Sequence, residues 1–181
     1  IVHNSACLTT DMTGIGCPPV TALYYGWKAI RNHELENRDI DFNPSSNSPA
    51  LLLDGGIRKP ADLVKAIVCG ADAVICGSIF AGRRETPGEI EVNHYSQRHF
   101  KRFRGMASRE VVEEYHLYDG NPENLFVEGT ELEVPYVDES VTDVVYRYVN
   151  GLRSAMAYLG VSYVSALKGS LWNGKKLGVM V

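Results

Sequence analysis

Residues 51–78 read LLLDGGIRKPADLVKAIVCGADAVICGS, and this stretch decides the fold class of the chain. Two short apolar runs, residues 51–53 and 73–76, are typical of strands buried on both faces of a sheet. Between them, residues 59–71 carry apolar side chains at helical spacing, and Gly70 is placed to end that helix. A strand, a helix and a second strand in this order predict a βαβ unit, and therefore a parallel sheet or barrel.

Helix signals also lie on both sides of this unit. Pro18 and Pro19 stand where a helix can begin, and apolar residues follow them at helical spacing. Ser108 is placed to cap a short helix that runs to Tyr115. A longer amphipathic helix is predicted over residues 141–159, and its apolar stripe is most simply explained by packing in a core or between subunits.

The composition excludes several classes of protein. The chain has 181 residues, of which 45% are apolar and 22% charged, as in an ordinary globular domain and unlike a disordered or fibrous one. With 18 basic and 22 acidic residues its net charge is −4, which argues against a nucleic-acid partner. The longest nearly apolar run, residues 73–82, is about half the length of a membrane-spanning helix. We therefore expect a cytoplasmic protein with no membrane partner and, because the chain begins with Ile1, part of a longer gene product.

Two glycine-containing turns are candidate anion sites. Asp54-Gly55-Gly56 and Gly77-Ser78 each follow a predicted strand, and ligands gather at the carboxyl ends of parallel strands. Glycine lets backbone N–H groups approach a phosphate closely, and Asp54 can accept hydrogen bonds from ribose hydroxyls. Alternatively, the glycines only turn the chain tightly and Asp54 caps the next segment. The residues alone leave both interpretations open.

The four cysteines are of two kinds. Cys69 and Cys76 lie in apolar runs and are expected to be buried thiols, and the absence of a Cys-x-x-Cys spacing argues against zinc. Cys7 lies instead in the polar sequence Ser-Ala-Cys-Leu-Thr-Thr, where a thiol can be an accessible nucleophile. An ordinary loop thiol is the alternative interpretation.

Two further features have simple structural interpretations. Glu128 follows a polar stretch and can be a solvated carboxylate before the turn at Gly129. The basic residues within 98–104 alternate with Phe100 and Phe103, and a charged surface explains them most simply, with contact to an anion or to RNA as the alternative.

A collinear set of motifs covers nearly the whole chain up to about Gly160. In chain order the motifs are Ser5-Ala6-Cys7-Leu8-Thr9-Thr10, Thr13-Gly14-Ile15-Gly16-Cys17-Pro18, Asp54-Gly55-Gly56-Ile57-Arg58-Lys59, Gly77-Ser78-Ile79-Phe80-Ala81-Gly82, Pro87-Gly88-Glu89, Arg104-Gly105-Met106-Ala107-Ser108, Glu128-Gly129, Glu133-Val134-Pro135-Tyr136 and Gly151-Leu152-Arg153-Ser154. Together they resemble the motifs of the IMP dehydrogenase and GMP reductase family, and their number and order make the resemblance specific.

This resemblance implies a fold and an assembly. The family fold is a (β/α)8 TIM barrel of the α/β class, and residues 1–181 resemble the C-terminal half of that single catalytic domain. A complete barrel usually takes about 250 residues, and we identify only two barrel strands here. The N-terminal half of the barrel is therefore expected to be absent from this chain or to lie on another chain. The family also implies a homotetramer.

The resemblance implies three catalytic residues and the chemistry that they perform. Cys7 resembles the nucleophile that attacks purine C2 and forms a covalent thioimidate. Thr9 and Glu128 resemble the pair that transfers protons when ammonia departs or water attacks. The hydride is carried by a nicotinamide cofactor.

The resemblance also implies which residues bind the nucleotide, the cofactor and an ion. The phosphate site is implied at Ser5, Gly56, Gly77 and Ser78, and the ribose anchor at Asp54. The remaining substrate-binding residues are Gly55, Gly105, Met106, Ala107 and Gly129. The cofactor-binding residues are Met106 and, in a stretch that resembles one reaching a neighbouring subunit's nicotinamide cofactor, Ser154, Ala155, Met156 and Ala157. A potassium ion is implied at the carbonyl groups of Val2, Asn4 and Cys7, although the family usually has glycine where Val2 and Asn4 stand.

Two activities of the family share the thioimidate. The dehydrogenase oxidises IMP with NAD and hydrolyses the intermediate to XMP, whereas the reductase removes ammonia from GMP and reduces the intermediate to IMP with NADPH. Gly77-Ser78 resembles dehydrogenases, but residues 105–128 lack the Arg-Tyr pair of their mobile flap, and residues 128–135 resemble a reductase. We therefore expect an NADPH-dependent GMP reductase, with an NAD-dependent IMP dehydrogenase as the alternative. Val2 and Asn4 leave a non-catalytic nucleotide-binding homologue as a third interpretation.

Overall fold

Two units make up the chain, and each has its own sheet and helices. The structure, a computed structural model, describes residues 7–36, 49–117, 121 and 125–172. The first unit comprises residues 1–16 and 76–146, and the second unit comprises residues 17–75 and 147–181.

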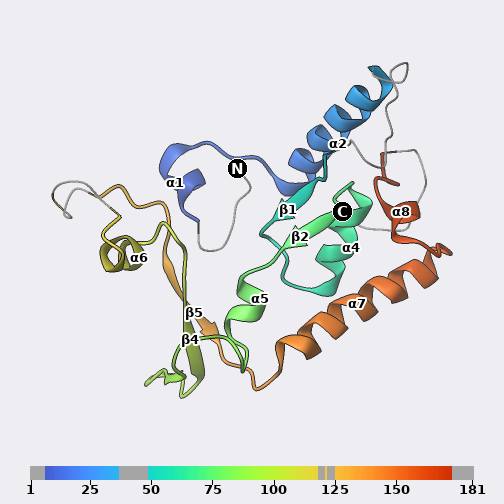
Figure 1. The fold of residues 1–181 in the computed structure, drawn as a ribbon. Coiled ribbons are helices and arrows are strands. Elements are labelled where there is room, and N and C mark those ends of the chain that lie inside the picture. The colour runs from blue at the N-terminus through green and yellow to red at the C-terminus, as the bar shows by residue number, and fades with distance from the viewer. Residues whose placement is uncertain (1–6, 37–48, 118–120, 122–124, 173–181) are drawn as a thin grey trace. The chain divides into compact units, whose positions relative to one another are not determined.

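The second unit contains the predicted βαβ motif. Strands β1 (Leu52–Asp54) and β2 (Ala73–Ile75) pair in parallel, with Leu52 opposite Ala73. Helix α4 (Pro60–Val68) connects them, and Figure 1 shows the two strands side by side with α4 next to them. The strand–helix–strand prediction from residues 51–78 is therefore confirmed.

Local capping explains where α4 begins and ends. Lys59 is the N-cap, and the Asp62 carboxylate accepts the backbone N–H of Lys59 at 3.0 Å. The C-cap is Cys69, so the helix ends one residue before the predicted Gly70. Gly70 follows with a φ of +109°, a left-handed conformation that favours glycine. Its missing side chain also leaves room for Trp27, because a Cβ at Gly70 would lie 2.8 Å from the Trp27 ring.

The core of the second unit lies between α4, α7 (Val141–Tyr158) and α8 (Val164–Leu167). Its buried cluster consists of Val64, Ile67, Val68 and Leu167, and the α7 residues that pack against it are Leu152, Ala155 and Met156, with Leu159 just after the helix. Helix α7 and the start of α4 lie close together at Gly151, where a Cβ would lie only 2.5 Å from Pro60. The absence of a side chain at Gly151 allows this approach. Helix α2 (Pro19–Glu36) begins at Pro19, as predicted.

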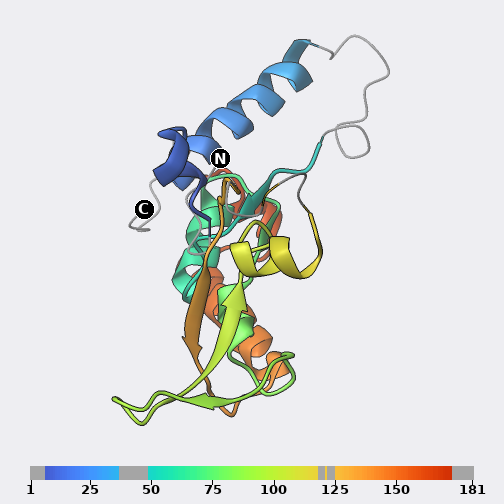
Figure 2. The same ribbon diagram turned by 90° about the vertical axis from the view of Figure 1, so that its left-hand side faces the viewer.

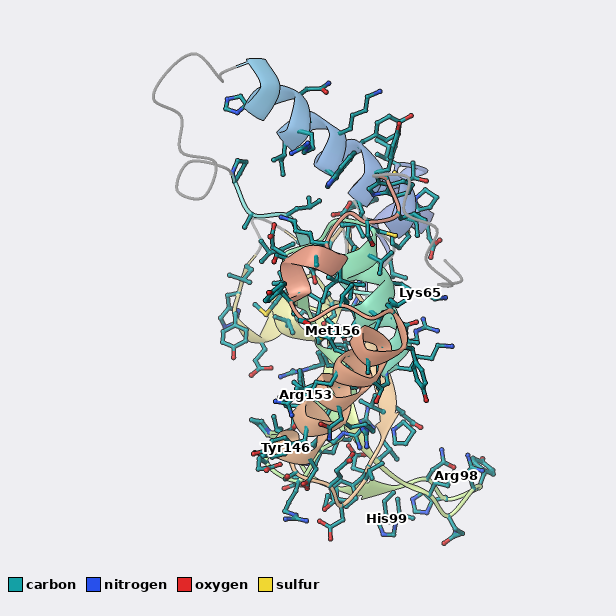
Figure 3. All side chains as sticks on the ribbon, turned by 90° about the vertical axis from the view of Figure 1, so that its right-hand side faces the viewer. Lys65, Arg98, His99, Tyr146, Arg153 and Met156 are labelled. Carbon is teal, nitrogen blue, oxygen red and sulfur yellow. The ribbon has the colours of Figure 1, made fainter. Side chains whose placement is uncertain are left out.

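The first unit contains an antiparallel sheet that the sequence did not predict. Strand β4 (His99–Arg104) pairs with β3 (Glu91–Val92) on one side and with β5 (Glu131–Pro135) on the other. Figure 2 shows β4 and β5 side by side and the β3–β4 turn projecting from them, and Figure 3 labels Arg98 and His99 at that turn. Short helices α1 (Thr9–Thr13), α5 (Ser78–Ala81) and α6 (Arg109–Glu114) complete the unit.

The arginines of β4 form exposed ion pairs on one face of this sheet. Arg102 lies 2.7 Å from Glu91 and also pairs with Glu131, and Arg104 pairs with Glu114. The hydrogen bond from Arg102 lowers the pKa of Glu91. Because these pairs are exposed to water, they contribute little to stability. The interpretation of residues 98–104 as a charged surface is confirmed for Arg102 and Arg104, but it is wrong for Lys101, which is buried.

Within the described residues the parallel sheet has two strands, β1 and β2. These residues therefore form a mixed α/β structure and not a closed barrel. Burial on both faces was predicted for its strands, and this is wrong for two side chains: Leu52 is 50% exposed and Ile75 is 48% exposed. The reason is that no described element covers these side chains. None of the helices that the structure describes is both long and apolar enough to span a lipid bilayer.

The substitution Leu167→Ala should lower the free energy of unfolding by about 2–5 kcal/mol, because it removes a fully buried side chain and leaves a cavity against α4. Val164→Ala on the same helix is the matched control, since Val164 is 42% exposed and its truncation should cost less than about 0.5 kcal/mol. Urea unfolding of the complete protein measures both variants. Equal losses would contradict the placement of Leu167 in the core.

Candidate active site

Three backbone segments of the first unit lie side by side. The Leu8 N–H donates to the Glu128 carbonyl at 2.6 Å, and Cys7 pairs with Gly129 in an isolated antiparallel bridge. On the other side, the Gly129 N–H donates to the Ala107 carbonyl at 3.0 Å. The segment 128–130 therefore lies between residues 7–8 and residues 105–107.

The thiol of Cys7 has a hydroxyl partner two residues further along the chain. Its Sγ donates to Thr9 Oγ1 at 3.2 Å, and Thr9 is the first residue of α1. Both side chains are half-buried, and Cys7 is a free cysteine. A half-buried thiol beside a hydroxyl acceptor is suited to act as a nucleophile whose proton is passed to a neighbouring group.

Glu128 contacts the segment of Cys7 and Thr9 through its backbone. Its carbonyl accepts the Leu8 N–H, so Glu128 is fixed next to the chain segment that carries Cys7 and Thr9. The side chain of Glu128 is half-buried. The structure thus brings all three predicted catalytic residues into one place in the first unit, and their chemical roles stay predictions.

Gly129 allows the close approach of these segments. It is buried, and a Cβ at this position would lie 2.7 Å from the Ala107 carbonyl carbon and 2.7 Å from the Ser108 nitrogen. Contacts this short do not occur for real side chains, and both clashing atoms belong to the backbone. A side chain at residue 129 would therefore push the segments 128–130 and 105–107 apart.

The predicted base-contact segment is a turn between β4 and α6. Gly105 donates its N–H to the Thr130 carbonyl at 3.1 Å, which extends the β4–β5 ladder into this turn. Met106 is 75% exposed, and Ala107 is also exposed. Ser108 is the N-cap of α6, as predicted, but its fully buried hydroxyl makes no capping bond and has no hydrogen-bond partner among the described residues. The exposed Met106 side chain is free of the core and can contact a flat ligand.

The predicted phosphate turn of the first unit begins α5. Gly77 is the N-cap of this helix and is exposed, and the half-buried Ser78 is its first residue. A Cβ at Gly77 would lie 3.1 Å from the ring carbon Cζ of Phe103 on β4. The turn therefore rests against the aromatic ring of the strand that leads to Gly105.

The other predicted nucleotide residues belong to the second unit. Asp54 ends β1 and is exposed, while Gly55 and Gly56 follow with φ values of +81° and +75°. The Gly55 N–H donates to the Ile75 carbonyl at 3.1 Å. This geometry requires two glycines for the turn itself, as the structural interpretation of these residues proposed. The adjacent cavity, which Gly55 and Gly56 help to line, has about 140 Å³ and is too small for a nucleotide.

The predicted cofactor residues of α7 have different environments. Ser154 and Ala155 line a groove of about 490 Å³ between α4 and α7, together with Lys59, Lys65 and Tyr158. Met156, which Figure 3 labels on α7, packs against the buried cluster instead, and Ala157 is exposed. The groove is large enough for part of a dinucleotide, and its two lysines suit a phosphate.

Three predicted residues, Val2, Asn4 and Ser5, lie outside the described residues. Within the described part of the chain, His, Cys, Asp and Glu side chains do not gather in groups of three or more that could hold a metal ion. Cys69 is fully buried, as predicted, and burial raises the pKa of its thiol, which keeps it protonated and unreactive. Cys76 is half-buried, so the expectation of a buried thiol is wrong at this position.

Sequence reasoning missed two side chains that organise the first unit. Lys101 is 2% exposed, although it lies in a basic run that predicted surface charge, and Phe103 packs against the Gly77 turn. The available signal was the period of two along His99–Arg104, which places Lys101 and Phe103 on one face of a strand and Arg102 and Arg104 on the other.

Comparison with known proteins gives a consistent result. The family described as IMP dehydrogenase / GMP reductase domain matches residues 2–175. An inosine-5'-monophosphate dehydrogenase of Borreliella burgdorferi is 34% identical over 171 residues, which cover 91% of this chain and 38% of that protein. The corresponding enzymes of Pasteurella multocida and Streptococcus pyogenes are 33% and 34% identical over 170 residues, covering 91% of this chain and 31% of each relative. The chain thus spans about a third of the length of these relatives.

With the purine nucleotide that the motif resemblance implies as substrate, Gly129→Ala should reduce kcat/KM at least about tenfold, because the added methyl group separates the segments that hold Glu128 and Met106. Thr130→Ala is the matched control, since it changes the neighbouring side chain and adds no atom against Ala107. Steady-state kinetics of the complete protein, with circular dichroism to verify folding, measure the effect. Unchanged kinetics for Gly129→Ala would show that this close approach is not required.

Proposed function

Because the chain belongs to the IMP dehydrogenase / GMP reductase family, we propose that it is part of a purine nucleotide oxidoreductase whose active site includes Cys7, Thr9 and Glu128. The observation that carries this proposal is the hydrogen bond from the Cys7 thiol to Thr9, on a segment paired with residues 128–129. The segment that carries the thiol and the hydroxyl thereby lies next to the backbone of Glu128, which comes from a distant part of the chain.

The proposed role of Cys7 is addition to purine C2. Its thiolate forms a C–S bond at C2, and this carbon then loses its hydrogen as a hydride, which leaves a covalent thioimidate. A bound nicotinamide supplies the hydride acceptor. Thr9 and Glu128 then take a proton from water as it adds to C2, and the Cys7 thiolate departs. The product of this sequence from IMP is XMP.

The nucleotide is held by backbone and polar groups in this proposal. The turn at Gly77 and Ser78 takes the phosphate. Roles for Ser5 and Gly56 at the phosphate, and for Asp54 at the ribose, stay predictions from the family resemblance. Residues 105–107 contact the base. Binding of the phosphate at a fixed place positions C2 over the Cys7 sulfur, which supplies the proximity that a bimolecular addition lacks.

The residues present fit a nicotinamide cofactor. Met106 is exposed next to the catalytic segment, where its thioether can contact the nicotinamide ring. Ser154 and Ala155 line the groove between α4 and α7 of the second unit, where Lys59 and Lys65 can pair with a phosphate group of the cofactor that a neighbouring subunit holds. NAD is the cofactor that the main proposal requires. A potassium ion at the carbonyls of Val2, Asn4 and Cys7 stays a prediction.

We favour the dehydrogenase over the reductase that the sequence motifs suggested. The relatives are named inosine-5'-monophosphate dehydrogenase, and they align with nearly the whole chain. The reductase remains the second candidate, because residues 105–128 contain no Arg-Tyr pair of the kind that dehydrogenases use to activate water. In that reaction Cys7 adds to C2 of GMP, ammonia departs, and hydride from NADPH gives IMP.

The exposed apolar side chains of β1 and β2 support a partner for the second unit. Parallel strands are normally covered on both faces, whereas Leu52 and Ile75 are about half exposed. We propose that the N-terminal half of a (β/α)8 barrel supplies the missing strands, on the same polypeptide or on a second one. Assembly of complete barrels into a homotetramer stays a prediction from the family.

Product analysis of the complete protein distinguishes the two activities. Incubation with IMP and NAD should give XMP and NADH, whereas incubation with GMP and NADPH should give no IMP. The opposite pattern would establish the reductase. Absence of product from both mixtures, together with retained nucleotide binding, would support a non-catalytic homologue instead.

Cys7→Ala should reduce turnover at least about 10³-fold while nucleotide binding is retained, because the alanine cannot form the C–S bond. Cys17→Ala is the matched control, since Cys17 is also a free, half-buried cysteine and should leave turnover unchanged. Steady-state rates and equilibrium binding of IMP measure the two properties. Turnover of Cys7→Ala at the wild-type rate would show that Cys7 is not the nucleophile.

A further inference from the structure

Lys101 is a cation buried inside the first unit, where only 2% of it is exposed. Its ammonium group donates to the Arg83 carbonyl at 2.9 Å and to the Thr86 carbonyl at 2.6 Å, and it lies 5.6 Å from the centroid of the Tyr136 ring. Burial of an ammonium group is unfavourable unless its donors are satisfied. Here two carbonyl dipoles and an aromatic face satisfy it, so the cation holds backbone in place.

The backbone that Lys101 holds is the loop that follows α5. This loop is tied back to the helix, because Arg83 Nε donates to the Ile79 carbonyl at 2.9 Å and the Thr86 hydroxyl donates to the Phe80 carbonyl. Helix α5 and its loop are therefore joined by hydrogen bonds into one piece. Lys101 connects that piece to β4.

A second contact connects the other end of α5 to the same strand. Phe103 lies two residues after Lys101, on the same face of β4. Its ring rests against Gly77, at the turn where α5 begins. Strand β4 then continues into the turn of residues 105–107, so one strand contacts both ends of the α5 piece and also carries the base-contact segment.

We propose that Lys101 is a positioning residue that sets the distance between the Gly77–Ser78 turn and residues 105–107. This inference rests on the proposed function: Lys101 fixes where the nucleotide phosphate lies relative to the segment that holds the purine. A displacement of about 1 Å between two such contact points is enough to reduce a rate by about 100-fold. Lys101 itself touches neither substrate nor cofactor.

The test is Lys101→Met in the complete protein, because methionine fills a similar volume and cannot donate to the two carbonyls. We expect kcat/KM for the nucleotide to fall at least about tenfold, with the larger part in KM. Turnover of the nucleoside that lacks the phosphate should be unchanged, since it does not use the Gly77–Ser78 turn. Arg98→Met is the matched control, because Arg98 is an exposed cation next to β4 and should leave both rates unchanged.

A uniform loss on nucleotide and nucleoside, or no loss on either, would overturn the positioning role. If Lys101→Met does not fold, Phe103→Leu provides the same test from the other contact, and it should show the same nucleotide-specific loss. Hydrogen exchange gives a readout that is independent of activity. Amides of residues 77–80 should exchange faster in Lys101→Met, while the amide of Gly129 should not change.

The hydrogen-exchange readout separates failure of this inference from failure of the proposed function. If the wild-type protein converts neither IMP nor GMP, the proposed function fails, and the exchange result alone decides whether Lys101 holds α5 against β4. Unchanged exchange at residues 77–80 would overturn the inference in either case.

Discussion

The described part of the site depends on the backbone of Gly129, which pairs with a different segment on each side. On one side Cys7 forms an antiparallel bridge with Gly129, and on the other side the Gly129 N–H donates to the Ala107 carbonyl. This double pairing requires glycine, because a Cβ would lie 2.7 Å from backbone atoms of Ala107 and Ser108. The backbone segments that carry Cys7, Glu128 and the exposed Met106 are neighbours as a consequence of that one close approach.

The strand–helix–strand unit was predictable because its signals are local. The apolar runs around β1 and β2, the Lys59–Asp62 cap and the two glycines after Asp54 all lie within residues 51–78. The amphipathic pattern that predicted a helix over residues 141–159 corresponds to α7. Such elements follow from periodicity and capping, which need no information about distant residues.

The antiparallel sheet and the buried lysine were not predictable in this way. Pairing of β4 with β5 joins Phe100 to Pro135, and no local pattern indicates a partner so far along the chain. Lys101 stands among basic residues and resembles a surface charge until the carbonyls of Arg83 and Thr86 are seen around it. The motif resemblance groups Cys7 with Glu128, and the structure pairs their segments through Leu8 with Glu128 and Cys7 with Gly129. The residues alone leave Cys7 either an accessible nucleophile or an ordinary loop thiol.

The most direct test of the account is mass spectrometry of the complete protein after incubation with a purine nucleotide that carries a halogen at C2. Attack by the Cys7 thiolate would displace halide and leave one nucleotide joined to sulfur. The account predicts this adduct on the peptide that contains Cys7, its suppression by excess IMP, and none on Cys17. Equal labelling of Cys7 and Cys17, or an unlabelled Cys7 in a protein that turns over nucleotide, would contradict it.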